Sequence, residues 1–317
     1  MRLKVQKPGL ISRIDGLDVA RGIALLAMAS YHFSWDLELF GFVEPGTAAS
    51  GFLKYYARSI ASSFLFLVGF SLVLATQNGV KWPSFLRRLT QVGSAATVIS
   101  LVTFYAVPES WIFFGILHHI VLASLIGLIF VRLHWAIALA AATIAFALPY
   151  SSLLATETKW LSLIGLYAVP PNSNDFVPLL PWLSASLIGI ASAKIAIENS
   201  WIEIIAKRKA NSGPARQLKF LGQHSLLFYV VHQPVLIAIV WLAAQIIPPT
   251  KNAADFQTEC KAVCGQQFNE NQCFTYCNCF ESELKDNAAQ WSQLPVEDQF
   301  KAISDTCSQV MRDKPNS

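Results

Sequence analysis

The chain has 317 residues, of which 54% are hydrophobic and only 14% are charged. A soluble domain carries about 25% charged residues, so this composition excludes a single water-soluble core. The apolar residues also cluster in runs about as long as a bilayer is thick. The chain is therefore predicted to be an integral membrane protein.

The formal net charge of +4 is divided unevenly along the chain. Residues 249–317 contribute −4 and hold all six cysteines, whereas the first 248 residues contribute +8. This change in composition predicts an amino-terminal segment at 1–14, a membrane domain at 15–248 and a cysteine-rich tail at 249–317.

Seven apolar segments predict transmembrane helices, so the expected fold is an all-α polytopic membrane helix bundle. In chain order they lie at 15–36, 55–76, 89–107, 111–131, 134–150, 176–197 and 220–246. A further apolar run at 160–169 ends at Pro170 and Pro171 and is too short to cross, so we interpret it as interfacial or re-entrant.

The Lys and Arg residues of the connections predict the orientation, because cytoplasmic loops carry the excess. With the amino terminus in the cytoplasm, the inner segments hold fourteen basic residues and the outer connections hold three. An odd number of spans then places the cysteine-rich tail outside, where disulfides persist.

A cleaved signal peptide is the alternative for the amino terminus, because basic residues precede an apolar run and the small-residue sequence Ala27-Met28-Ala29. Asp18 and Arg21 interrupt that run and leave only about eight apolar residues. The sequence therefore favours an uncleaved first helix.

Four ionisable residues share one face of the first helix at about 100° per residue: Asp18, Arg21, His32 and Asp36. Such a stripe is costly against lipid, so we expect it to line the bundle interior, with His32 about 21 Å from Asp18 in the outer half of the membrane. The structural alternative is an interfacial ion pair of Asp18 with Arg21, and a His32 that only takes part in a polar network.

Two other helices carry histidines at a comparable depth. Tyr229 and His232 share a face of the last helix, and the pair His118 and His119 lies near the outer end of the fourth helix. Histidine suits proton transfer near neutral pH, and a neutral imidazole is also a nucleophile. Hydrogen bonding between helices is at least as good an interpretation for His118, His119 and His224.

Basic residues gather at the predicted cytoplasmic rim, at Lys81, Arg87 and Arg88 and in the cluster 207–219. These positive charges could bind a phosphorylated cofactor. A simpler interpretation, on charge alone, is that they set the orientation of the chain in the membrane and bind anionic lipid.

The chain resembles the heparan-α-glucosaminide N-acetyltransferase catalytic-domain family, and its bacterial members most closely, in five segments in the correct order. These are RIDGLDVARGIA at 13–24 with YHFSWDL at 31–37, SFLFLVG at 63–69, GILH at 115–118, PLLPW at 178–182, and LGQHSLLFYVVHQP at 221–234. The resemblance covers about residues 12–246 and leaves out the tail.

This resemblance implies a transmembrane acyltransferase of the bacterial inner membrane. Members of the family are thought to take an acetyl group from acetyl-CoA (or another acyl-CoA) on the cytoplasmic side and pass it to an amino-sugar acceptor on the outer side. The bacterial branch of the family is shorter than the lysosomal enzyme and lacks its large lumenal amino-terminal region, so an amine or hydroxyl of an envelope glycan is the expected acceptor. The expected partners are the bilayer, the glycan and a second copy of the chain, with no nucleic acid and no metal.

The matching position makes His32 the expected catalytic histidine, either as general base or as carrier of the acyl group. Asp36 would orient it, and His232 and Tyr229 would stabilise the developing oxyanion. The residues expected at the acyl-CoA are Asp18, Arg21, Arg87, Arg88 and His118.

Six cysteines lie in the tail, at Cys260, Cys264, Cys273, Cys277, Cys279 and Cys307. The first four form two pairs at helical i,i+4 spacing, so two short helices stapled by two disulfides are expected, with the last two cysteines left for a third bond. The sequence does not choose among the fifteen connectivities. Zinc binding is the alternative, which the absence of any histidine after His232 disfavours.

Two other classes of function fit the membrane domain. Intramembrane His and Asp residues also form proton relays in transporters, although those usually show internal repeats, which are not evident here. A non-catalytic membrane scaffold that retains the fold is the third interpretation.

Overall fold

The structure is a computed structural model that describes residues 13–151, 159–166, 171–247, 257, 260–261, 264–265, 268–286 and 296–313. These residues form helices and no strand, as the apolar segments predicted. The chain divides into two compact units, one of Met1–Asp36 with Ala48–Ile239 and one of Leu37–Thr47 with Val240–Ser317. The expected segment at 1–14 lies almost entirely outside the described residues.

Most helices of the membrane domain follow the apolar runs of the sequence, and two further helices, Trp201–Lys207 and Gly213–Gln223, begin between the expected spans. They are α1 (Asp15–Leu39), α2 (Gly51–Thr76), α3 (Trp82–Ala106), α4 (Ile116–Val131), α5 (Trp135–Ala147), α6 (Leu179–Glu198), α7 (Trp201–Lys207), α8 (Gly213–Gln223) and α9 (Ser225–Ile246). Among the described residues, α2, α3, α6 and α9 are long and apolar enough to cross a bilayer, which makes this an integral membrane protein. Because α4 and α5 are shorter and α1 carries charges, the number of seven spans stays a prediction.

The largest differences from the expected boundaries lie in the third, fourth and last spans. The third helix begins at Trp82 rather than 89, because Pro83 occupies its first turn, where a missing N–H costs nothing. The fourth begins at Ile116 rather than 111, since Gly115 before it is extended. The span expected at 220–246 is interrupted at His224, which ends the amphipathic helix α8 before α9 begins.

The run expected to be interfacial, at 160–169, is only partly described. Lys159–Ser162 form a short 3-10 turn and residues 167–170 lie outside the described part of the chain. The described portion therefore contains no spanning helix at this place.

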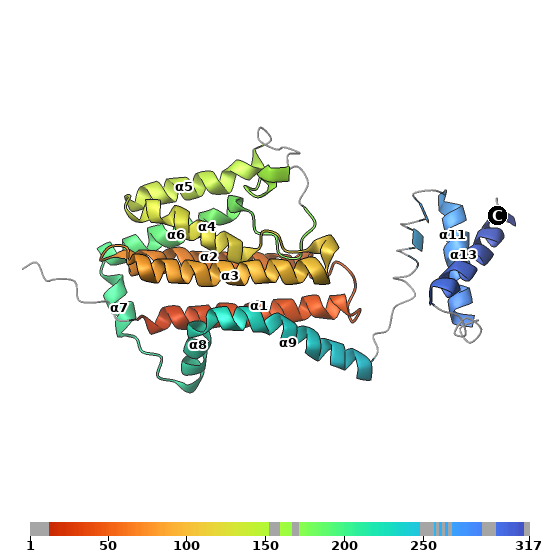
Figure 1. The fold of residues 1–317 in the computed structure, drawn as a ribbon, viewed down its shortest axis with the longest axis horizontal. Helices are drawn as coiled ribbons and strands as arrows, with labels where there is room; N and C mark the ends of the chain where they lie inside the picture. The colour runs from red at the N-terminus through yellow and green to blue at the C-terminus, as the bar shows by residue number, and fades with distance from the viewer. Residues whose placement is uncertain are drawn as a thin grey trace, which may run out of the picture. The chain divides into compact units, whose positions relative to one another are not determined.

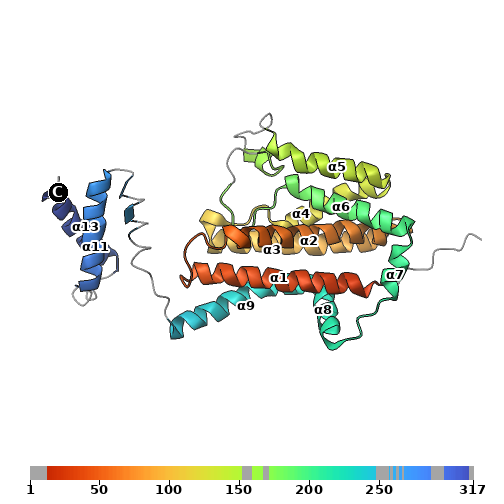
Figure 2. The ribbon, with the colours of Figure 1, turned by 180° about the vertical axis from the view of Figure 1, so that it is seen from behind.

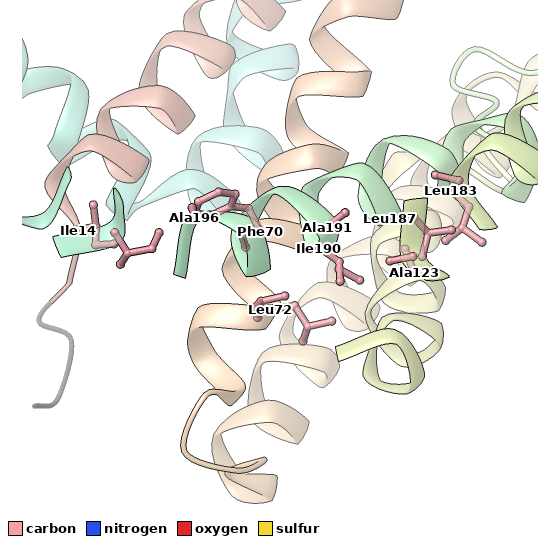
Figure 3. Close-up of a cluster of buried hydrophobic side chains, with 14 residues drawn as sticks. Ile14, Phe70, Leu72, Ala123, Leu183, Leu187, Ile190, Ala191 and Ala196 are labelled. Carbon is pink, nitrogen blue, oxygen red and sulfur yellow. The ribbon is translucent and has the colours of Figure 1, made fainter. Parts of the chain in front are cut away.

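Helices α2 and α6 form the centre of the first unit. Helix α2 packs along α6 and against α4, and α5 packs along the other side of α6. In Figures 1 and 2 these helices form one group, while α1 lies beside α8 and the start of α9. The largest buried apolar cluster joins α2, α4, α5 and α6, with Leu187 and Ile190 of α6 among its members (Figure 3).

Glycines let two pairs of helices approach closely. A Cβ on Gly69 of α2 would overlap the backbone of Ser186 in α6, and a Cβ on Gly189 of α6 would overlap the backbone of Phe66 in α2. Small residues at such crossings are typical of membrane helix packing, because lipid provides no hydrophobic force between helices.

The same reciprocal arrangement joins α1 to α8. A Cβ on Gly22 would overlap the backbone of Leu218, and a Cβ on Gly222 would overlap the backbone of Asp18. An ion pair between Lys219 Nζ and Asp15 Oδ1, at 2.9 Å, lies at the same crossing. These contacts hold α1 against α8, which leads directly into α9.

The second unit contains the disulfides predicted from the cysteine spacing. The bonds are Cys260–Cys277, Cys264–Cys273 and Cys279–Cys307, so each cysteine of the first i,i+4 pair bonds to one of the second pair. The third bond joins α11 (Glu270–Asp286) to α13 (Val296–Asp313), whose buried contact includes Phe280 and Ile303. The disulfide interpretation is thus confirmed over the zinc interpretation.

Candidate active site

Asp18 and Arg21 form an ion pair near the start of α1. Asp18 is 1% exposed, and its carboxylate accepts hydrogen bonds from Arg13 Nε at 2.6 Å and from Arg21 Nη1 at 2.7 Å. Gln223 of α8 donates to the same carboxylate at 3.4 Å, and the other end of the Arg21 guanidinium hydrogen-bonds to Ser71 of α2. Both Asp18 oxygens are therefore occupied by protein, and the pair links α1, α2 and α8.

Of the two arginines expected at the cofactor on α3, Arg88 lines a cavity of about 300 Å³ between α2, α3 and α4, whereas Arg87 is not among its lining residues. Lys81 is the other charged residue of this cavity, and its walls are mostly apolar. No carboxylate pairs with Arg88 among the described residues, and it lies close enough to Arg21 for their charges to interact. The cavity thus combines apolar walls with positive charge.

The two histidines expected on α1 and α9 meet. The ring centroids of His32 and His232 lie 5.1 Å apart, with the rings inclined at 63°. His232 is buried and His32 is half-buried. The helical stripes inferred separately for the first and last spans therefore face each other in the tertiary structure.

Asp36 does not hydrogen-bond to His32, although the two are one turn apart. Its Oδ1 instead accepts a hydrogen bond from Gln233 Nε2 at 2.7 Å, across the α1–α9 contact. Asp36 is fully buried, and both its Oδ2 and the Oε1 of Gln233 lack a hydrogen-bond partner among the described residues. Sequence reasoning missed Gln233 because an amide does not titrate; its position next to His232 was the available signal.

Tyr229 connects the histidine pair to a third element, the segment that precedes α6. The Tyr229 hydroxyl donates to Asp175 Oδ2 at 3.4 Å, and the same carboxylate oxygen accepts from the backbone N–H of Ile116, the first residue of α4, at 3.0 Å. Burial raises the pKa of the Asp175 carboxyl, against the opposing effect of these two hydrogen bonds. Asp175 was not expected from the sequence, because it lies in a connection between predicted spans.

Two extended connections hold Asp175 in place. The backbone N–H of Asn174 donates to the Ser110 carbonyl at 2.9 Å, and that of Val177 donates to the Phe114 carbonyl at 3.1 Å. Residues 171–178 therefore run along residues 109–115, which places the carboxylate over the amino end of α4.

The neighbouring histidines of α4 have different roles. His118 Nδ1 accepts from the Gly115 backbone N–H at 3.2 Å and its Nε2 lies 3.3 Å from Ser100 Oγ, so both ring nitrogens are used within the protein. None of these contacts is with the Arg21–Arg88 region expected to hold the cofactor. His119 is fully buried; its Nδ1 lies 3.2 Å from the Pro178 carbonyl, and its Nε2 has no partner among the described residues.

The family is decided by a match to its sequence pattern. Residues 13–234 match the model of the family described as "Heparan-alpha-glucosaminide N-acetyltransferase, catalytic". This chain belongs to that family. The match begins just before α1 and ends within α9, so it contains the whole site described above and leaves out the cysteine-rich tail.

Membership confirms the resemblance found in the five sequence segments and makes the protein a membrane acetyltransferase. Neither a curated protein nor a solved structure matches the chain significantly.

Proposed function

We propose that this acetyltransferase moves an acyl group from a cytoplasmic acyl-CoA, acetyl-CoA in the simplest case, to an amino-sugar or glycan acceptor on the outer side of a bacterial inner membrane. The observation that carries the proposal is the contact between His32 and His232, which belongs to the same α1–α9 contact as buried acceptors that have no donor among the described residues.

The character of these acceptors supports an amino sugar. Asp36 Oδ2, Gln233 Oε1 and His232 Nε2 are buried without a partner among the described residues. An unpaired buried polar group costs about 1–3 kcal/mol, so a ligand that donates to several of them is bound selectively. An amino sugar offers one amine and several hydroxyls as donors.

The cavity between α2, α3 and α4 supports the acyl-CoA side of the proposal. Its apolar walls suit the aliphatic arm of the donor, and Arg88 and Lys81 suit phosphate groups. The cavity lies near Arg21, toward the end of the bundle at which α1 begins, and the distribution of Lys and Arg favours the cytoplasm for that end.

An imidazole of the α1–α9 pair acts in either of two mechanisms. As a general base it removes a proton from the acceptor while the acceptor attacks the thioester. As a nucleophile it carries the acyl group as an acyl-imidazole before the acceptor arrives. Both mechanisms need the same neutral ring near both substrates.

Purified full-length protein in lipid vesicles tests the proposal. With radiolabelled acetyl-CoA outside and glucosamine inside, vesicles whose proteins have their cytoplasmic side outward are expected to accumulate N-acetylglucosamine in the lumen. Replacing both rings of the pair, His32→Ala together with His232→Ala, is expected to abolish this transfer, whereas His224→Ala, at an exposed ring outside the site, is expected to retain it.

The rival function is a proton-coupled permease, because buried His and Asp residues also relay protons. Uptake of unmodified glucosamine that needs no acetyl-CoA and persists without any acetylated product would favour the permease and contradict the proposed transfer.

A further inference from the structure

Helix α9 holds the His232 ring in one orientation. Its Nδ1 lies 2.7 Å from the backbone carbonyl oxygen of Tyr229, and the ring stacks on Phe228 with 6° between the planes. A carbonyl oxygen only accepts hydrogen bonds, so Nδ1 carries the proton and, in the neutral ring, Nε2 keeps its lone pair. The backbone of α9 thus selects the tautomer.

No group among the described residues donates a hydrogen bond to the basic nitrogen of this tautomer. Nε2 is buried and lacks a hydrogen-bond partner among the described residues, and His232 as a whole is 8% exposed. The bare oxygens of Asp36 and Gln233 belong to the same α1–α9 contact. A neutral His232 therefore accepts a proton here, whereas an oxyanion would need a donor.

His32 differs from His232 in this respect. Its ring contacts His232 and Tyr31, but neither of its nitrogens hydrogen-bonds to a residue in the described ranges. No contact with the described part of the chain therefore selects a tautomer of His32. Of the two facing rings, only His232 has a lone pair whose position is fixed by the fold.

We propose that His232, through Nε2, is the general base of the transfer reaction, a role that rests on the proposed function. The acceptor nitrogen forms a bond to the carbonyl carbon of the thioester while its proton moves to Nε2, which gives an imidazolium. The carbon–sulfur bond then breaks, the thiolate of CoA leaves, and the imidazolium returns the proton to that sulfur. The products are an amide and free CoA, and the neutral His232 is restored.

The test compares two acceptors in the full-length protein with acetyl-CoA as donor. At a pH above the pKa of its amine, glucosamine is neutral but only moderately nucleophilic and depends on a base, whereas hydroxylamine is strongly nucleophilic. Removal of a general base typically costs 10²–10⁴-fold, so His232→Gln is expected to slow transfer to glucosamine at least about 100-fold. Transfer to hydroxylamine is expected to fall about 10-fold or less.

The matched control is His224→Gln, because His224 Nδ1 also lies near a backbone carbonyl, that of Phe220 at 2.9 Å, but its ring is exposed. It is expected to leave both rates unchanged. Equal losses with both acceptors in His232→Gln would overturn the assignment and indicate a structural role, as would an unchanged rate with glucosamine. Absence of any CoA release by the wild-type protein would overturn the proposed function together with the assignment.

A second measurement determines the tautomer in the wild-type protein itself. Nitrogen-15 NMR of the wild-type protein with labelled histidine distinguishes a protonated Nδ1 from a protonated Nε2, and the signal of His232 is the one missing in His232→Gln. The expected neutral tautomer carries its proton on Nδ1. A proton on Nε2 would overturn the proposal whatever the activities are.

Discussion

Substitution of Gly22 by alanine tests the packing that holds helix α1 against α8. An ideal Cβ on Gly22 would lie 2.8 Å from the carbonyl carbon and 3.0 Å from the Cα of Leu218. Carbon atoms in contact are about 3.5–4.0 Å apart, and no side-chain rotation removes an overlap with backbone atoms. The two helices must therefore separate to accept the methyl group.

Two opposing effects decide the sign of the stability change. Forcing an extra methyl group into a packed interface costs about 1–3 kcal/mol, and a backbone obstacle favours the upper part of this range. Alanine in place of glycine in a helix interior contributes about 0.8–1.0 kcal/mol in the other direction. Gly22→Ala is therefore expected to lower the free energy of unfolding by about 1–2 kcal/mol.

Gly93→Ala in α3 is the matched control. Its Cβ would meet only Val121 Cγ2, at 3.9 Å, which is an ordinary contact. The helix preference then acts alone, and the variant is expected to be about 1 kcal/mol more stable than the wild type. The two substitutions have the same chemistry and opposite expected signs.

Unfolding of the detergent-solubilised variants, followed by tryptophan fluorescence, measures both effects, and acetyl transfer is measured in parallel. Gly22→Ala is also expected to slow transfer, because α8 leads into α9 and so positions His232 relative to His32. A Gly22→Ala protein as stable as Gly93→Ala would refute the close α1–α8 approach on which this reasoning depends.

Three further predictions concern other polar and covalent contacts. Burial raises the pKa of Asp175 above its ordinary value of 3.8, so ionisation of this carboxyl opposes folding. The stability of the wild type relative to Asp175→Asn should therefore fall as the pH rises through the raised pKa, and it should recover below pH 3.8. Thermal unfolding of both proteins at a series of pH values checks this. Asp18→Asn leaves Arg21 without its carboxylate partner and is expected to lower the free energy of unfolding by about 1.5–3 kcal/mol, as measured with denaturant. An unchanged free energy of unfolding would show that the ion pair contributes nothing to stability. Replacing both Cys279 and Cys307 by serine removes a disulfide whose loop constraint stabilises the tail by about 3–4 kcal/mol. Limited proteolysis should therefore cleave the tail of the variant faster than that of the wild type. An equal cleavage rate would contradict a stabilising bond.

Local patterns were enough to predict much of the architecture. Apolar runs fix the existence of the helices, because a bilayer requires long apolar segments with internally satisfied backbones. The i,i+4 spacing of the cysteines predicted the stapled tail, and helical periodicity put His32 and Asp36 on one face of α1. Each of these features depends on residues close together in the sequence.

The polar contacts of the site were less predictable. The sequence suggested that Asp36 orients His32, but the Asp36 carboxylate hydrogen-bonds to Gln233, nearly two hundred residues away. His118 was expected at the cofactor, yet its ring nitrogens bind the Gly115 N–H and Ser100. A helical face predicts which side chains point the same way, but it does not predict which other face they meet.

The amino-acid sequence by itself determined that this protein is a helical membrane protein of the acetyltransferase family, with a disulfide-bonded tail. Hydrophobicity, charge and residue spacing act over one helix at a time, so they are readable along the chain. Only the tertiary structure decided that His32 meets His232 and that Asp175 joins α4 to α9. These outcomes depend on how closely distant helices pack, which glycines such as Gly22 and Gly222 permit and which no local pattern specifies.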